Sequence, residues 1–313
     1  MKPQPPGALQ VPAPRPPRLL RRPELLAPRV EPDAAQRRVV DAPAGSGPLV
    51  VLSAPGTGAT TTLVEAVAAR VERDGLDPDR VLVLAPSRRA AQALRDLVSE
   101  RLRRTMAEPA ARTPQSYAFG LLRRVRALAG DPPPRLITGA EQDLVLADLL
   151  RGHQAGADPG WPADVPREAW TLRTFRTELR DLLMRATERG LSPVDLDELG
   201  RRHARPEWVA AARAMQEYLD VNALGRADGY DPAGVVDEAV GWLQADAGLL
   251  RAERERWALV AVDDAHDVSE AGFRLLDELC GGGRDLLLFA DPDAVTEGFR
   301  GADARTVAQL AHR

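Results

Sequence analysis

Four short apolar runs stand out in a chain whose hydrophobic positions otherwise recur with helical spacing. They read PLVVLS at 48–53, VLVLA at 81–85, ALVAV at 258–262 and LLLFA at 286–290. Strands that are apolar throughout are typical of a parallel sheet covered by helices on both faces. The pattern therefore predicts an α/β fold whose central parallel sheet contains these four strands.

Helices are predicted between the runs. Asp33 is a suitable N-cap for a short helix ending near Val40, and further helices are expected over about 60–70 and 87–103. Between about 136 and 252 apolar residues recur three and four apart, and no run there is a convincing buried strand. Because strands precede and follow this block, we predict one sheet interrupted by an inserted helical subdomain.

The predicted organisation has four parts. Residues 1–32 are rich in proline and arginine, and prolines at that density prevent regular helix or strand, so we expect a flexible leader. Residues 33–135 form the first part of the sheet domain and residues 253–313 its second part. The helical insertion spans residues 136–252.

Composition excludes several classes of protein. Hydrophobic residues make up 44% of the 313 residues, which indicates a globular chain. The single cysteine, Cys280, excludes a disulfide framework and fits a reducing compartment. No stretch approaches the roughly 20 apolar residues of a membrane helix, and no signal peptide is recognisable. We therefore expect a cytoplasmic protein without membrane association.

Charge adds one regional feature. The net charge is −4, but the segment from Arg70 to Arg126 contains 13 arginines and 7 acidic residues, a local balance of +6. Such a segment can present positive charge to phosphates. Charge alone favours the simpler interpretation, in which these arginines lie on solvated helix faces.

The turn after the first run is a candidate nucleotide site. Residues 53–60 read SAPGTGAT between a predicted strand and a predicted helix, which is the setting of a phosphate loop ending in Gly-Lys-Ser/Thr. Glycines let backbone N–H groups converge on phosphate oxygens, and the helix directs the positive end of its dipole to the same place. The candidate nucleotide-binding residues of this turn are Pro55, Gly56, Thr57, Gly58, Ala59, Thr60 and Thr61.

Ala59 occupies the position where the phosphate-loop pattern has lysine. Alanine supplies neither a hydrogen-bond donor nor the charge that bridges the β and γ phosphates. Lys2 is the only lysine of the chain, so any substitute must be an arginine from elsewhere. A Gly-rich turn between strand and helix can also be only a turn, and the loop by itself leaves both interpretations open.

Two acidic segments bear on that choice. Residues 258–267 read ALVAVDDAHD, which resembles the Walker B motif of superfamily 1 DNA helicases, a hydrophobic strand followed by Asp-Glu-Ala-Gln-Asp. Residues 290–294 (ADPDA) and 299–302 (FRGA) resemble the next motif of that family, Gly-Asp-Pro-Asp-Gln continuing to Phe-Arg-Gly-Ala.

Three further segments match the same family in the same order. DAAQ at 33–36 resembles the adenine-reading glutamine motif, so Gln36 is the candidate adenine contact. APSRRAA at 85–91 and TPQSYA at 113–118 resemble two motifs that touch single-stranded DNA. Five motifs in order over about 33–303 mark the chain as similar to UvrD/Rep-like superfamily 1 helicases.

This resemblance implies a RecA-like P-loop NTPase fold, with the helical insertion as the 1B subdomain. It implies ATP and Mg²⁺ as cofactors, with Thr60 and Asp263 as the Mg²⁺ ligands. It implies single-stranded DNA as a partner. The DNA-binding candidates are Ser87, Arg88, Arg89, Thr113, Ser116, Tyr117, Phe299 and Arg300. For Phe119, next to this set, a core position is the better prediction.

Within the family the chain most resembles RecB-like helicase–nuclease subunits of the AdnA/AdnB type. The residues that carry this resemblance are LITGAEQDLVLADLL at 136–150, FRTELRDLLMRATERG at 175–190 and PEWVAAA at 206–212. The resemblance implies a partner helicase or nuclease subunit, or further C-terminal domains that include a second RecA-like domain.

The departures from the family concentrate on its chemistry. Ala59 replaces the lysine, and Asp264 replaces the glutamate expected as general base. His266 replaces the glutamine that senses the γ-phosphate, and Ala294 replaces the glutamine that couples nucleotide to DNA. We therefore expect weak or vestigial use of ATP and Mg²⁺ with deficient hydrolysis, because losing one preorganised contact of this kind costs about 2.7–4 kcal/mol of barrier.

Three functions stay open at this point. The first is a motor-like DNA helicase or helicase–nuclease subunit of DNA repair or recombination whose ATP site is degenerate. The second is an active ATP-dependent 3′–5′ DNA helicase domain, as the family resemblance alone implies. The third is a non-enzymatic interaction protein built on a helicase fold. The four departures favour the first over the second, and the basic segment favours the first over the third.

Overall fold

The structure, a computed structural model, describes residues 31–45, 47–103, 111–225, 228–296, 298 and 301–302. Nearly all of the predicted leader therefore lies outside the described residues. Two of the predicted DNA contacts, Phe299 and Arg300, lie outside them as well.

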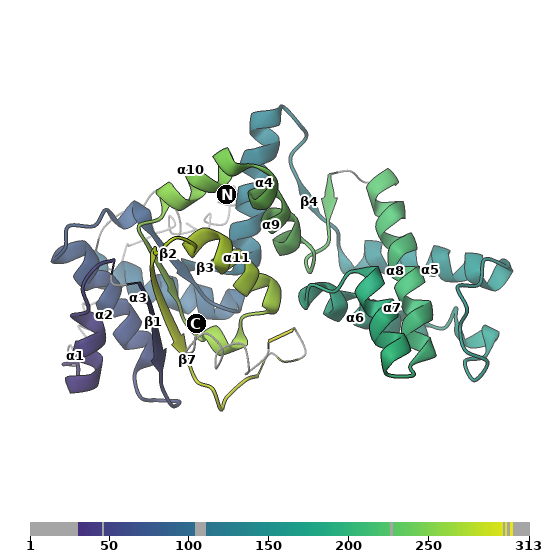
Figure 1. Ribbon diagram of the computed structural model, residues 1–313, viewed down its shortest axis with the longest axis horizontal. Helices are drawn as coiled ribbons and strands as arrows, with labels where there is room; N and C mark the ends of the chain where they lie inside the picture. Colours follow the sequence, from purple (N-terminus) through teal and green to yellow (C-terminus); the bar gives the residue numbers. More distant parts are fainter. Residues whose placement is uncertain are drawn as a thin grey trace, which may run out of the picture.

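A parallel sheet forms the centre of the larger part of the molecule (Figure 1). Its strand order is β1-β7-β6-β2-β3, and every neighbouring pair is parallel. The strands are β1 (Pro48–Leu52), β2 (Val81–Leu84), β3 (Ala111–Arg112), β6 (Leu259–Val262) and β7 (Asp285–Ala290). The predicted α/β class is confirmed, and all four apolar runs are strands of one sheet.

The register of the sheet brings the ends of distant motifs to one edge. Leu52 of β1 pairs with Ala290 of β7, and Leu84 of β2 pairs with Val262 of β6. Because parallel strands end at the same edge, the segments after β1, β2, β6 and β7 all leave the sheet there. This carboxyl edge is where the candidate site residues are expected to meet.

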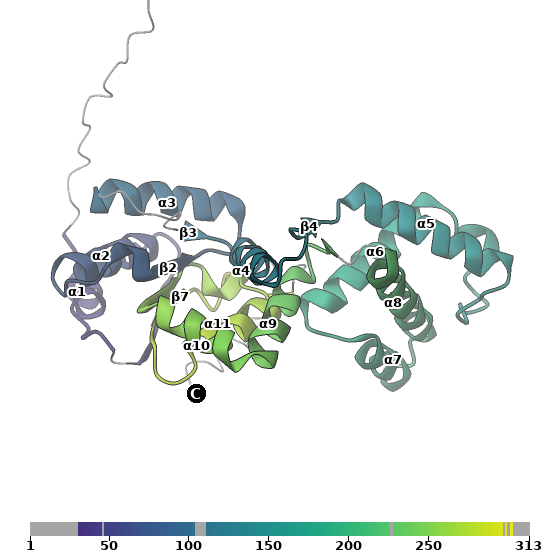
Figure 2. The same ribbon diagram turned by 90° about the horizontal axis from the view of Figure 1, so that it is seen from above.

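Helices cover both faces of the sheet (Figure 2). Helices α2 and α3 pack on one face, where their apolar residues join Val83, Ala261 and Leu287 in one core cluster. Helices α4, α9 and α11 pack on the other face around Leu84, Val262 and Leu288. Helix α1 packs on α2, and α10 packs on α9 and α11. The bounds are α1 (Ala34–Val40), α2 (Ala59–Glu72), α3 (Arg88–Leu102), α4 (Pro114–Ala129), α9 (Val235–Ala245), α10 (Ala247–Arg256) and α11 (Glu270–Cys280), with short 3-10 turns η1 (Pro78–Arg80) and η3 (Ala265–Asp267).

A second, wholly helical unit lies beside the sheet domain in both views (Figures 1 and 2). It has its own core, which includes Leu146, Leu183 and Met215. Its helices are α5 (Gly139–Ala155), α6 (Arg173–Glu188), α7 (Pro193–Arg202) and α8 (Pro206–Gly225), with the 3-10 turn η2 (Arg167–Ala169). A two-stranded strip, β4 (Arg135–Leu136) with β5 (Gly229–Tyr230), joins it to the sheet domain.

The predicted insertion of 136–252 thus contains helices that pack in two different places. Helices α5–α8 share the separate core, whereas Val236, Ala239 and Val240 of α9 belong to the core beneath the sheet. Both groups show the same three- and four-residue apolar spacing, so periodicity could not separate them.

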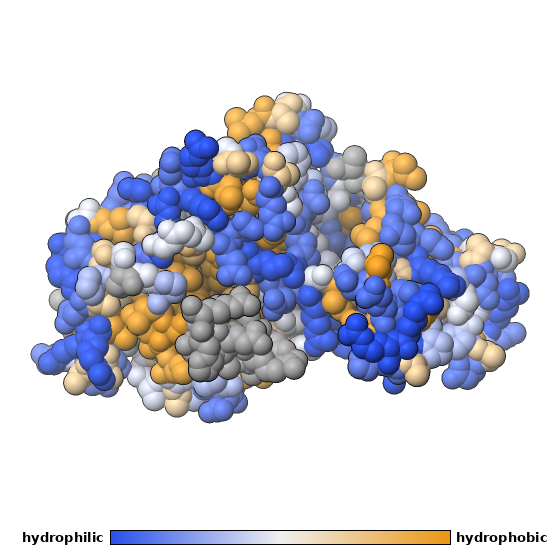
Figure 3. All heavy atoms as spheres, viewed as in Figure 1, coloured by the Kyte–Doolittle hydropathy of each residue, from blue (hydrophilic) through white to orange (hydrophobic). Residues whose placement is uncertain are grey.

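The edge strand β1 is less covered than the inner strands. Each residue of β2, β6 and β7 is buried, whereas those of β1 are half-buried or exposed. Figure 3 shows apolar surface over the region of β1, while hydrophilic residues cover α6 and α7.

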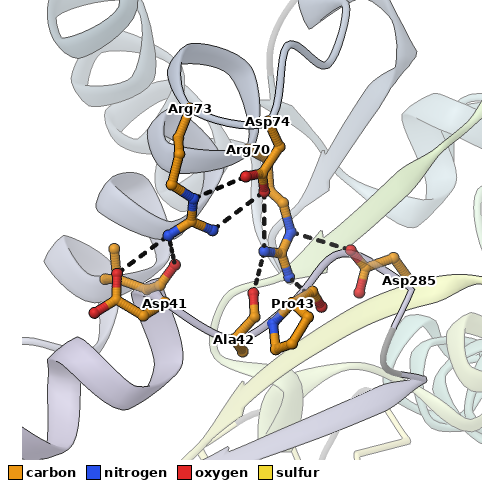
Figure 4. A network of polar contacts seen from close by, with 8 residues as sticks. Asp41, Ala42, Pro43, Arg70, Arg73, Asp74 and Asp285 are labelled. Carbon is orange, nitrogen blue, oxygen red and sulfur yellow. Dashed lines mark hydrogen bonds and ion pairs between the residues drawn. The ribbon is translucent and has the colours of Figure 1, made fainter.

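A buried arginine fastens the segment after α1 to the sheet (Figure 4). Arg70 of α2 donates from Nε to Asp285 at the start of β7 over 3.1 Å, and it also donates to the carbonyl oxygens of Ala42 and Pro43. Arg73, one turn away, pairs with Asp41 and Asp74 near the surface. This arginine clamp holds the chain that leads from α1 into β1.

None of the helices in the described ranges is both long and apolar enough to cross a bilayer.

Candidate functional site

The turn between β1 and α2 has the backbone of a phosphate loop. Gly56 and Gly58 have φ of +76° and +86°, a region in which other residues are strained. Helix α2 begins at Ala59, so the free N–H groups of its first turn face the loop. Pro55, Thr57 and Thr61 are exposed around it. The loop can therefore present backbone donors to an anion.

Gln36 lies directly against this loop. Its Nε2 donates to the carbonyl oxygen of Thr57 over 2.9 Å, and its Oε1 accepts from the Asp33 amide over 3.0 Å. A β-carbon at position 58 would lie 2.9 Å from Gln36 Nε2, so Gly58 is what lets the two approach. The structure thus joins the glutamine motif to the phosphate loop, and adenine reading by Gln36 stays a prediction.

Thr60 and Asp263 meet across the carboxyl edge. The Thr60 hydroxyl donates to Asp263 Oδ2 over 2.9 Å. Asp263 is 5% exposed, and its other oxygen, Oδ1, is buried with no hydrogen-bond partner among the described residues. A hydroxyl beside such a carboxylate oxygen fits a hard cation such as Mg²⁺. No group of three or more His, Cys, Asp or Glu side chains suited to a metal occurs in the described part of the chain, so Mg²⁺ would depend on phosphate oxygens and water for its other ligands.

Asp263 should make the stability of the protein depend on pH. Burial, reinforced by the charge of Asp264, raises the pKa of Asp263 from 3.8 to about 6. A carboxyl whose pKa is raised on folding favours the fold while it is protonated, and this advantage is lost as pH rises through about 6. We expect Asp263→Asn to raise the free energy of unfolding by roughly 2–3 kcal/mol at pH 8 and by little at pH 4.

Urea denaturation of both proteins at the two pH values measures this difference. Asparagine keeps an oxygen that can accept from Thr60, so the hydrogen bond is retained. An equal effect of the substitution at pH 4 and pH 8 would contradict the assignment.

Asp264 has an unusual backbone. Its φ and ψ are 46° and 47°, in the left-handed region, which non-glycine residues enter at a cost and which often marks functional sites. Burial raises the pKa of Asp264, and the charges of Asp267 and Asp291 raise it further. The side chain at the general-base position is therefore held in a constrained place, one methylene shorter than glutamate.

His266 and Asp267 tie this acidic motif to the segment after β7. Buried His266 accepts from the Asp291 amide at Nδ1 over 3.0 Å, which places the proton of the neutral ring on Nε2. Asp267 accepts from the Thr296 amide over 2.7 Å and from its hydroxyl over 2.5 Å. His266 is thus a buried, hydrogen-bonded member of the site.

A cavity of about 880 Å³ lies beside this edge, between the sheet domain and the helical unit. Ser87 and Arg88 line one wall, and Thr113 and Ser116 line the next. Its other lining residues include Arg95, Arg112, Phe119, Leu136, Met184, Glu188, Pro232, Ala233, Asp267 and Ser269. The cavity combines basic, hydroxyl and apolar groups, which are the groups that bind the phosphates and bases of a single strand.

Among the predicted DNA contacts, Ser87, Arg88, Thr113 and Ser116 line the cavity, whereas Arg89 does not. Ser87 and Thr113 cap α3 and α4, and their oxygens accept from the Ala90 and Ser116 amides, which leaves each hydroxyl proton free to donate. Arg88 is exposed at the cavity wall and makes no hydrogen bond or ion pair with the described residues. Arg89 is also exposed, but it does not line the cavity.

Tyr117, one of the predicted DNA contacts, is buried in the structure and cannot reach a DNA strand. Its ring is 0% exposed, its hydroxyl donates to Glu253 over 2.5 Å, and Trp257 Nε1 donates to it over 3.0 Å. Burial raises its pKa far above the usual value. Phe119, predicted to lie in the core, is half-buried and packs against the core, and it also lines the cavity. Tyr117 shares its helix face with Leu121 and other apolar residues spaced three and four apart, and this face packs toward the sheet. The spacing is visible in the sequence and could have predicted that Tyr117 is buried.

A parallel sheet, a Gly-rich loop between β1 and α2, and an acidic motif after β6 together define the P-loop class of nucleotide-binding folds. Within this class the chain belongs to the UvrD/REP helicase N-terminal domain family, whose model matches residues 33–313. The predicted family is confirmed.

Several known proteins are similar to this chain. DNA helicase II of Escherichia coli (strain K12) is 24% identical, with 87% of this chain and 35% of the relative covered. An ATP-dependent helicase/nuclease subunit of Exiguobacterium sibiricum is 27% identical, with 72% and 22% covered. A probable DNA helicase of Mycoplasma pneumoniae is 24% identical, with 82% and 46% covered. The chain thus spans less than half the length of each of these relatives.

Proposed function

We propose that this chain is the N-terminal motor-type domain of a DNA helicase or helicase–nuclease subunit of DNA repair or recombination, with a nucleotide site that is deficient in hydrolysis. The observation that carries the proposal is the Thr60–Asp263 hydrogen bond directly beside Ala59. The half of the site that holds Mg²⁺ is present, whereas the half that holds the β and γ phosphates lacks its cation.

The contacts around the loop support this division. Thr60 and Asp263 would hold Mg²⁺, which supplies charge neutralisation for the phosphates when bound. The loop is bonded from outside by the Gln36 amide and the Asp263 carboxylate, and neither group supplies the positive charge of a lysine. Asp263 lies at the loop, and Asp264 and Asp291 lie near enough for their charges to act within this group. These carboxylates disfavour a polyphosphate without its metal.

Single-stranded DNA is the ligand that we assign to the 880 Å³ cavity. Its lining hydroxyls and arginines suit phosphates, and Phe119, Leu136 and Met184 offer apolar surface to bases. Met184 and Glu188 of α6 line the cavity from the helical unit. This unit, α5–α8, takes the role of the 1B subdomain. The similarity to a helicase/nuclease subunit supports a partner subunit or further domains.

Arg88→Glu should weaken single-strand binding and flatten its salt dependence. Arg88 is an exposed cation at the cavity wall, and each phosphate contact contributes roughly 0.7 to the slope of log affinity against log salt for single strands. We expect a loss of about tenfold or more in affinity for a fluorescent oligo(dT) in low salt, with the slope reduced by roughly one. Fluorescence anisotropy at several salt concentrations measures both quantities.

Arg89→Glu is the matched control, because Arg89 carries the same charge one residue away but does not line the cavity. It should reduce affinity less than Arg88→Glu. Equal slopes for the natural chain and Arg88→Glu would rule out a phosphate contact at this position.

An active helicase domain is the second candidate. Its support is the family itself, which implies the use of ATP and Mg²⁺ in general. The experiment that separates the two is Mg²⁺-dependent binding and turnover of ATP by the natural chain. Measurable turnover stimulated by single-stranded DNA would favour the active domain, and its absence together with oligo(dT) binding supports the degenerate site.

A further inference from the structure

The end of α6 meets the sheet domain through two glycines. Gly301, with φ of +82°, lies so close to α6 that a β-carbon there would be 3.2 Å from the Glu188 carbonyl oxygen. Gly190, with φ of +70°, follows α6, and a β-carbon there would overlap the guanidinium group of Arg274 on α11. The positive φ favours glycine at both positions. At position 301 the crowding atoms belong to the backbone of α6, whereas at position 190 they are the end of the Arg274 side chain.

The sheet-domain side of this contact is well anchored. Arg274 pairs with Asp237 of α9. The Glu270 amide donates to the Gly301 carbonyl oxygen over 3.3 Å, and Ala302 forms an antiparallel bridge with Ser269. The contact is therefore fastened to the beginning of α11, directly after the acidic motif.

The β4–β5 strip also connects the two parts, but it is short. It pairs just two residues of each strand, and so small a ladder leaves rotation between the two parts soft. The Tyr218 hydroxyl of α8 donates to Asp231 over 2.8 Å, which fastens the end of the strip to the helical unit rather than to the sheet. A second contact is needed to fix the placement of the helical unit, and the two glycines supply it.

The same end of α6 forms part of the cavity wall. Met184 and Glu188 line the same cavity as Ser87 and Thr113. A displacement of α6 away from the sheet domain would therefore widen the cavity and separate its apolar wall from its hydroxyl wall.

We propose that Gly190 and Gly301 are positioning residues, which hold α6 at the separation from the sheet domain that a single DNA strand requires. The proposal rests on the proposed function, because that function assigns single-stranded DNA to the cavity. It predicts that adding one methyl group at either glycine displaces the helical unit and weakens strand binding without touching the strand.

The test combines a distance with an affinity. In the full chain with Cys280→Ala, spin labels are attached at Ser99→Cys of α3 and Ala223→Cys of α8, both exposed positions. We expect Gly301→Ala and Gly190→Ala each to shift or broaden the distance between the labels, measured by pulsed electron resonance. Each should also weaken oligo(dT) binding on the order of tenfold, as for the loss of about one stacked base.

Two control variants separate the contact from other effects. Gly298→Ala changes the same segment, and nothing lies within 4 Å of a β-carbon there. Gly282→Ala introduces the strain of a positive φ (+90°) with open space around it. Both should leave the label distance and the affinity as in the parent.

The outcomes are distinguishable. Unchanged label distances in both Gly301→Ala and Gly190→Ala would overturn the proposal. A shifted distance with unchanged oligo(dT) affinity would overturn its link to strand binding. If the glycine variants shift the label distance but the parent protein itself binds no oligo(dT), the positioning contact is supported and the proposed function is refuted.

Discussion

Ala59→Lys is expected to tighten Mg²⁺-dependent binding of a fluorescent ATP analogue by roughly 30-fold. A hydrogen bond to a charged group contributes about 1.5–3 kcal/mol, and about 2 kcal/mol corresponds to a factor of about 30. The rest of the loop is already shaped for the ligand, because Gly56 and Gly58 have the required positive φ and Thr60 is bonded to Asp263. Equilibrium titration with and without Mg²⁺ measures the effect.

The variant should gain affinity without gaining rapid turnover. Asp264 is shorter than the expected general base, and a misplacement near 1 Å can cost about 10²-fold in rate. Ala59→Gln, which is long but uncharged, is the control and should bind little better than the natural chain. Tight binding of the analogue by the natural chain would contradict the role given to Ala59 and favour the active-helicase alternative.

The sequence could predict the sheet because its signal is local and strong. Each of the four apolar runs is a strand. Those that form β2, β6 and β7 are buried on both faces and leave no polar position, whereas β1 is an apolar strand at the edge of the sheet. The two-residue strand β3, Ala111–Arg112, carries no such signal and depends on pairing with β2. The grouping of α9 with the sheet was equally unpredictable, because it depends on which core lies nearest after folding.

The candidate site was predictable where a motif fixes the backbone and not where it depends on side-chain direction. The loop, Thr60 and Asp263 meet as the motifs imply. Tyr117 is wholly buried, whereas Phe119 is half-buried against the core and also lines the cavity, because the two residues lie at different angles around the helix that follows the Thr113 cap. The hydrogen bond from Asp291 to His266 joins residues 25 positions apart, and only the folded sheet brings them together.

Arg70→Ala is expected to lower the free energy of unfolding by about 3–5 kcal/mol. Arg70 is 2% exposed and pairs with Asp285, which is also buried. Removing one member of a buried pair leaves the other charge without compensation, which accounts for the size of the expected loss. The carbonyl oxygens of Ala42 and Pro43 also lose their donor (Figure 4). Urea denaturation followed by circular dichroism measures the change.

Arg73→Ala is the matched control for this clamp. Arg73 lies on the same helix with its side chain 43% exposed, and its ion pairs with Asp41 and Asp74 are near the surface. Exposed pairs contribute roughly 0–1 kcal/mol, so its loss should be small.

Asp285→Asn in the Arg70→Ala background removes the orphaned charge and should recover on the order of 2 kcal/mol. Equal losses for Arg70→Ala and Arg73→Ala, or no recovery in the double variant, would show that the buried pair does not hold this part of the fold. Because Arg70 holds the chain between α1 and β1, Arg70→Ala should also loosen the placement of Gln36 against the phosphate loop. Arg73→Ala should loosen it less, because the contacts of Arg73 with Val40 and Asp41 are exposed.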